Sequence, residues 1–178
     1  MNPQSAPPAA FRPLGLADPR LYLAIAGMVL GNLALPWAVH RIPDAGPALL
    51  PMFFFTLIAG WRFGVKAGLL TGLLSPLANH LLTGMPPAPA YLLLMGQSAV
   101  LGALAGAAGA RRPRPTLAQV MAVVLVHQAL VAWPVLTQAG ARAAWLGFEL
   151  RLPGILLQIL GGCALLRLLA PRPRPDAG

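Results

Sequence analysis

A small set of hydrogen-bonding side chains interrupts a chain that is 57% hydrophobic. Amide, imidazole, indole and guanidinium groups suit the reversible recognition of a small molecule through hydrogen bonds and ring stacking. Inside apolar segments such groups are costly, and they usually face a cavity or a partner. The set comprises Asn32, Asn79, His80, Gln97, His127, Gln128, Trp133, Glu149, Arg151 and Gln158.

Residue patterns for covalent or metal chemistry are absent from the sequence. There is no GxxxxGK[ST] loop for ATP, no CxxC or HExxH ligand pair, and no GxSxG elbow. The three histidines are scattered, and few carboxylates are available to orient them. The single cysteine, Cys163, excludes an intrachain disulfide. We therefore expect no catalytic residues, no metal and no cofactor.

The composition indicates that a lipid bilayer is the solvent. Only 10% of the residues are charged, against about 25% in a soluble domain, and the mean hydropathy is +0.70. The net charge of +9 does not indicate nucleic acid, because the basic residues form no stripe with interleaved aromatics. They lie at the ends of apolar segments, where lipid headgroups and membrane topology explain them.

Six apolar segments approach the length of about 20 residues that a membrane-crossing helix needs. They are 21–39, 47–61, 64–82, 91–110, 117–137 and 152–170. The sequence thus predicts an all-α membrane protein with six transmembrane helices in one compact bundle. The predicted divisions are an N-terminal tail at 1–20, the membrane domain at 21–170 and a C-terminal tail at 171–178.

Lysine and arginine in short loops predict the orientation. Ten basic residues fall on one side of the segments and three, Arg41, Arg142 and Arg151, on the other. Both termini are therefore expected in the cytoplasm, in a multi-pass protein of the cytoplasmic (inner) membrane. The outer loops are then 40–46, 83–90 and 138–151.

In this orientation the polar residues converge on an outward-facing pocket formed by the third to sixth helices, with the loop 83–90 across its mouth. Other interpretations stay open for single members. His127 would serve helix packing, Glu149 and Arg151 would form a pair among headgroups, and Met85 would be a packing residue.

Glycines recur at four-residue spacing on three helices: Gly64, Gly68 and Gly72, then Gly102 and Gly106, and also Gly27 and Gly31. Small residues let membrane helices approach closely. Internal packing explains most of them, and docking of a membrane partner is the alternative for any one face.

The amino-acid sequence of residues 21 to 110 resembles that of the substrate-binding S component of energy-coupling factor (ECF) transporters, the vitamin-uptake systems of prokaryotes. The resemblance is carried by residues 36–40, Gly46-Pro47, Leu50-Pro51-Met52, Ala59-Gly60, Gly64 and Lys66-Ala67-Gly68, and above all by Gly72–Pro76 and Leu81–Pro87, which read GLLSP and LLTGMPP. Phe53 departs from the histidine that many relatives have after the Pro-Met pair.

The resemblance implies a six-helix protein that binds a vitamin or vitamin precursor near the outer face and works with a membrane coupling subunit and two cytoplasmic ATPases. Asn79, His80, Met85, Gln97, His127, Trp133, Arg151 and Gln158 are then the expected substrate contacts. Gln97, His127 and Gln158 would form hydrogen bonds with the polar edge of the vitamin. Trp133 would stack on its ring, and Arg151 would bind a carboxylate or phosphate group if the ligand has one. The nearest small residues to the family's docking motif are Ala24, Gly27 and Gly31.

Two other classes of function remain. A structural membrane scaffold or assembly subunit would use its polar groups only for packing and would have no outward cavity. An intramembrane enzyme would use His80 or His127 with Glu149, but no motif supports it.

Overall fold

The computed structural model describes residues 14–39, 51–88 and 90–170, and every regular element in these ranges is a helix. The outer loop expected at 40–46, the start of the second apolar segment, the C-terminal tail and most of the N-terminal tail lie outside the described residues. The described part is therefore all-α, as the sequence predicts. The number of helices that cross a membrane stays a prediction.

The first helices begin and end at recognisable signals. Helix α1 (Pro19–Val39) starts with proline at its first position, and Asp18 Oδ1 accepts a hydrogen bond from Arg20 N at 2.9 Å. Helix α3 (Pro51–Phe63) also starts with proline. Helix α4 (Val65–Thr83) ends at Gly84, whose left-handed conformation (φ 70°) lets its N–H bond the His80 carbonyl oxygen.

The C-terminal part of the chain is an antiparallel helical hairpin. After α5 (Ala90–Arg111), helix α6 (Leu117–Leu156) opens with a capping box between Thr116 and Gln119. Helix α6 is interrupted at Gly140, where φ is 85° and ψ is 172°. The chain then runs back through the π-helix η1 (Leu157–Gly161) into α7 (Gly162–Leu169).

This hairpin corrects one expectation from the sequence. Residues 138–151 are not a loop: only Gly140 departs from helical geometry there, and the return helix begins directly after it. The sequence around 141–149 is rich in alanine, which favours helix, and contains no proline. A single glycine is enough to reverse the chain.

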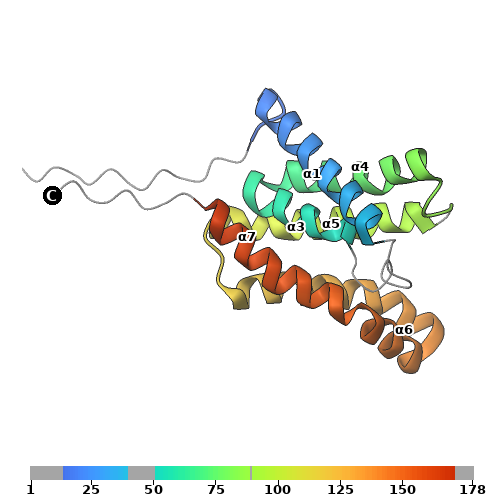
Figure 1. The fold of residues 1–178 in the computed structure, drawn as a ribbon. Coiled ribbons are helices and arrows are strands. Elements are labelled where there is room, and N and C mark those ends of the chain that lie inside the picture. Colours follow the sequence, from blue (N-terminus) through green and yellow to red (C-terminus); the bar gives the residue numbers. More distant parts are fainter. Residues whose placement is uncertain (1–13, 40–50, 89, 171–178) are drawn as a thin grey trace, which may run out of the picture.

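The helices form a bundle in which α3 and α5 are central (Figure 1). Helices α1 and α4 pack against α3, and α4 packs also along α5. The α6 hairpin covers the opposite side of α3 and α5. The main core lies between them and contains Leu57, Trp61, Leu101, Val124 and Ile159, among other buried residues.

Glycines bring α4 and α5 into backbone contact. A methyl group built on Gly68 would overlap the carbonyl of Gly102, and one on Gly72 would lie 2.6 Å from the Ser98 carbonyl. A methyl group on Gly106 would overlap the Val65 backbone. The packing interpretation of these stripes is confirmed, since both helices need glycine for so close an approach.

One end of the bundle, which we call the basic end, holds the start of α4, the end of α5 and the end of α7. Hydrogen bonds tie it together: Trp61 Nε1 donates to the Arg112 carbonyl oxygen at 3.0 Å, and Arg167 Nε donates to that of Pro115 at 3.0 Å. Its basic residues are Arg20, Arg62, Lys66, Arg111, Arg112, Arg114 and Arg167. The opposite end, the far end, holds the residue 84–88 connection and Gly140.

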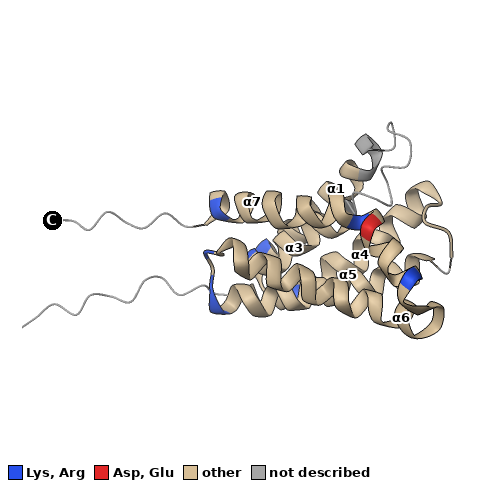
Figure 2. Cartoon of the chain, turned by 90° about the horizontal axis from the view of Figure 1, so that it is seen from below, with Lys and Arg blue, Asp and Glu red and all other residues tan. Residues whose placement is uncertain are grey.

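Most lysine and arginine residues gather at the basic end, while Arg142, Glu149 and Arg151 lie on the part of α6 that follows Gly140 (Figure 2). Two helical runs, Ala90–Arg111 and Leu117–Leu169, are long and apolar enough to cross a membrane. Only 33% and 22% of their most apolar windows are buried, so most of their apolar surface faces outward.

Candidate functional site

A buried hydrogen-bonded network joins the four N-terminal helices. Asn32 Nδ2 donates to Thr56 Oγ1 at 3.1 Å and to Ser75 Oγ at 2.9 Å, and Asn32 Oδ1 accepts from Phe55 N at 3.1 Å. Thr56 Oγ1 lies 3.2 Å from Ser98 Oγ. Each of these polar groups has a partner and is inaccessible, so the network holds helices together and offers no free group to a ligand.

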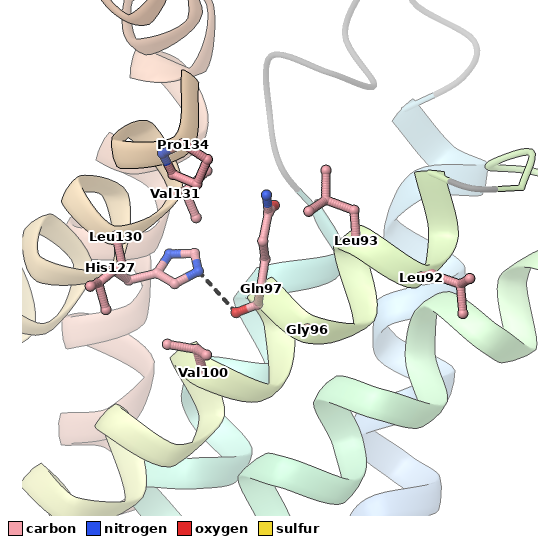
Figure 3. Close-up of a pocket in the computed structure, with 9 residues that line it drawn as sticks. All are labelled: Leu92, Leu93, Gly96, Gln97, Val100, His127, Leu130, Val131 and Pro134. Carbon is pink, nitrogen blue, oxygen red and sulfur yellow. Dashed lines mark hydrogen bonds between the residues drawn. The ribbon is translucent and has the colours of Figure 1, made fainter. Parts of the chain in front are cut away.

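A groove between α5 and α6 brings two expected site residues together (Figure 3). Its volume is about 310 Å³, at the lower end of the usual range for small-molecule sites, about 300–1,000 Å³. We call it the α5–α6 groove. Its walls are Leu92, Leu93, Gly96, Gln97 and Val100 from α5, and His127, Leu130, Val131 and Pro134 from α6.

Helical periodicity produces both walls. Residues 93, 96, 97 and 100 recur at three- and four-residue intervals on α5, as do residues 127, 130, 131 and 134 on α6. The groove lies in the half of the bundle toward the far end, because α5 starts there and α6 reaches it at Gly140.

His127 and Gln97 form the polar part of the groove. His127 Nε2 donates to the Gln97 carbonyl oxygen at 3.0 Å, since a carbonyl can only accept. The ring is 1% exposed, and its Nδ1 has no hydrogen-bond partner among the described residues. The Gln97 side chain extends along the groove between Val131 and Leu93 (Figure 3). The Gln97 side-chain amide is thus open to hydrogen bonds in the groove, and the His127 Nδ1 acceptor is buried beside it without a partner among the described residues.

Three expected site residues instead fasten the connection between α4 and α5. Asn79 Nδ2 donates to the Met85 carbonyl oxygen at 2.8 Å, and His80 Nδ1 donates to that of Pro86 at 2.8 Å. The His80 ring also stacks on Tyr91, with centroids 4.2 Å apart. The Met85 side chain is exposed. None of the three lines the α5–α6 groove.

The remaining expected contacts are spread over the α6 hairpin. Trp133 is 64% exposed and does not line the groove. Arg151 is half-buried, and its Nε donates to the carbonyl oxygen of Gly147 on its own helix. Gln158 is fully buried in η1, and both of its amide atoms lack a partner among the described residues, as does Gln128 Oε1. The groove therefore brings together Gln97 and His127, and none of the other expected contacts lines it.

The three expected docking residues differ in their surroundings. Gly27 is open, with no atom within 4 Å of an added methyl group, and Ala24 is partly buried. Gly31 packs against the Phe55 ring, which a methyl group would meet at 2.8 Å. Around Gly27, the exposed Leu23 and Leu30 continue an open face of α1. Gly31 belongs to the inside of the bundle.

The apolar groove residues were missed by reasoning from the sequence, which singled out polar groups only. The available signal was the apolar residues at three- and four-residue spacing around Gln97 and His127. No group of three or more His, Cys, Asp or Glu side chains that could hold a metal occurs within residues 14–39, 51–88 and 90–170.

Comparison of the chain with protein-family models, with curated proteins and with solved structures finds no match.

Proposed function

We propose that the chain is a multi-pass protein of the cytoplasmic membrane with its basic end in the cytoplasm. Large apolar side chains are exposed along the bundle, including Leu23 at 75% and Leu168 at 80%. Soluble monomers rarely expose contiguous apolar surface on such a scale. The gathering of basic residues at one end of the bundle supports the same arrangement.

Within that membrane we propose the role of a substrate-binding S component of an ECF-type transporter. The observation that carries the proposal is the α5–α6 groove, which pairs Gln97 with His127 in the half of the bundle away from the basic end. A mainly apolar cleft with few aimed polar groups is the usual form of a small-molecule site. The resemblance of residues 21–110 supports this role. ATP hydrolysis falls to partner subunits.

A structural scaffold is the second candidate, and a specific observation favours it. The Asn32 network is internally satisfied, and the glycines of α4 and α5 are used for packing. A scaffold needs these features and no groove. The two candidate functions differ in their response to a side chain that fills the groove: a transporter subunit would lose substrate uptake, and a scaffold would keep its function.

The test is uptake of labelled vitamins by cells that carry the chain and its partner subunits, with Leu130→Trp compared with Leu125→Trp. Both leucines are exposed on α6, but only Leu130 lines the groove. We expect Leu130→Trp to reduce uptake of one vitamin about tenfold or more and Leu125→Trp to leave it unchanged. Equal behaviour of the two variants, or no uptake that depends on the chain, would favour the scaffold.

A further inference from the structure

The α5–α6 groove has a chemical character that the resemblance does not specify. None of the nine described residues that line it carries a charge. Arg151, the basic residue expected to meet an acidic ligand, is not among them and bonds within its own helix. The Arg151 charge acts on His127 from outside this lining, so a carboxylate or phosphate in the groove would lose hydration without a directly contacting counter-charge, which is unfavourable.

The polar groups of the groove select for a hydrogen-bond donor. Because His127 Nε2 carries the proton donated to Gln97, the neutral ring leaves Nδ1 as an acceptor. This atom is buried without a partner among the described residues, and Figure 3 shows it on the side of the ring toward Val131. A hydroxyl or N–H group would satisfy it once the two helices part slightly. Gln97 can accept or donate.

The groove is open at the side of the bundle. Leu92, Leu93 and Leu130 on its walls are each more than half exposed. In the orientation proposed above, these leucines contact lipid acyl chains. A molecule that dissolves in the bilayer therefore reaches the groove without passing the residue 84–88 connection.

Resting on the proposed function, we propose that the cargo of the α5–α6 groove is an uncharged, mainly apolar ring compound with a hydrogen-bond donor, which enters from the bilayer. The volume of about 310 Å³ suits a compound of one or two fused rings. Acidic vitamins and phosphorylated precursors are excluded from this groove.

A single cysteine placed in the groove tests the proposal. Gly96→Cys in a Cys163→Ala background is suitable because a methyl group at Gly96 meets no atom within 4 Å. Ala139→Cys, next to the turn at the far end, is the control. The purified chain in lipid nanodiscs is labelled with neutral N-phenylmaleimide or with a charged methanethiosulfonate. We expect the neutral-to-charged rate ratio at position 96 to exceed that at position 139 about tenfold or more. Equal ratios would overturn entry from the bilayer.

Protection of the same cysteine by three matched probes tests the ligand class. The probes are 2-naphthol, which is neutral with a donor, 2-methoxynaphthalene, which is neutral without one, and 2-naphthoate, which is charged. We expect protection to decrease in that order, and Gln97→Leu to weaken protection by naphthol. Protection that is greatest with naphthoate, or absent with all three, overturns the proposal. Val131→Cys replaces Gly96→Cys if that variant does not fold.

The two proposals fail in different ways. If the chain assembles with a coupling subunit and ATPases and supports uptake of an acidic vitamin, the inference on ligand class is wrong and the transport function stands. If the probes rank as expected but no assembly or uptake is found, the groove binds such compounds without being part of a transporter.

Discussion

At the scale of single residues, Asn32 links three of the N-terminal helices through its side-chain hydrogen bonds. It contacts Thr56, Ser75 and the Phe55 amide from a position with no solvent exposure. Without Asn32, Thr56 Oγ1 and Ser75 Oγ would lose their bonds to its amide and keep those to the carbonyl oxygens of Met52 and Thr71. Loss of hydrogen bonds in a buried network costs about 1–3 kcal/mol. In membranes the measured values are smaller, because the unfolded reference state also finds partners.

We therefore expect Asn32→Ala to lower the free energy of unfolding by about 1–3 kcal/mol. Ser98→Ala is the control, since it removes only the 3.2 Å contact with Thr56 and should cost about 1 kcal/mol or less. The measurement is denaturant unfolding in mild detergent, followed by circular dichroism. Equal effects of the two substitutions would show that Asn32 does not organise the network.

Gly140 also affects stability as a single residue, through its backbone conformation. Its combination of φ 85° and ψ 172° is a region open essentially to glycine alone. Gly140→Ala should destabilise the chain by about 1–3 kcal/mol. Gly147→Ala in the same helix is the control, because there the added methyl meets only the movable Arg151 guanidinium at 3.3 Å. The measurement is thermal unfolding of both variants. If Gly140→Ala were as stable as Gly147→Ala, the backbone conformation at residue 140 would not require glycine.

At the scale of elements, the contact between α4 and α5 depends on glycine. Gly102→Ala would place a methyl group on the Gly68 carbonyl, and rigid backbone on both sides leaves it no room. Overpacking of this kind costs about 1–3 kcal/mol. Gly96→Ala on the same helix meets nothing within 4 Å and should stabilise by up to about 1 kcal/mol through helix propensity. Opposite signs of the two shifts in unfolding free energy are the expected result.

The helices themselves could be predicted from the sequence, because apolar length and terminal signals are local properties. The segment predicted at 91–110 is helix Ala90–Arg111, and that at 64–82 is Val65–Thr83. The segment 138–151 was not predicted correctly, since composition does not reveal that Gly140 alone would reverse the chain.

The candidate site could be predicted only in part, for a related reason. Gln97 and His127 were chosen from the sequence and do meet at the groove. Asn79 and His80 lie at the end of α4, where the backbone carbonyls of residues 85 and 86 are nearer partners than any ligand. The rotation of each helix about its axis decides which side chains face each other, and that depends on long-range packing.

At the scale of the whole molecule, the distribution of charge predicts the orientation in the membrane. In the orientation that we propose, with the basic end in the cytoplasm, Ala139 at the far end would lie outside and Ala110 at the end of α5 would lie inside. In a Cys163→Ala background, Ala139→Cys should react with an impermeant thiol reagent on intact cells. Ala110→Cys should react only after permeabilisation. Neither substitution changes the distribution of basic residues that sets the orientation. The reverse labelling pattern would therefore refute the proposed orientation.

Two open glycines allow ligand binding and partner docking to be separated. Gly27 lies on the exposed face of α1, which we propose meets the coupling subunit, and Gly96 lies in the α5–α6 groove. Neither has an atom within 4 Å of an added methyl group, so a larger side chain starts in open space, outside α1 at Gly27 and in the groove at Gly96. We expect Gly27→Trp to prevent co-purification of the coupling subunit and ATPases while naphthol binding persists.

We expect Gly96→Trp to have the opposite effect, because an indole ring fills the groove and leaves α1 unchanged. Assembly is measured by affinity purification from membranes that contain all subunits, and binding is measured by calorimetry on each purified variant. We expect each variant to lose about tenfold or more in one property, either assembly with the partner subunits or naphthol binding, and to keep the other unchanged. If Gly27→Trp assembles normally, α1 is not the docking face, because a bulky ring at its centre would hold a partner helix away.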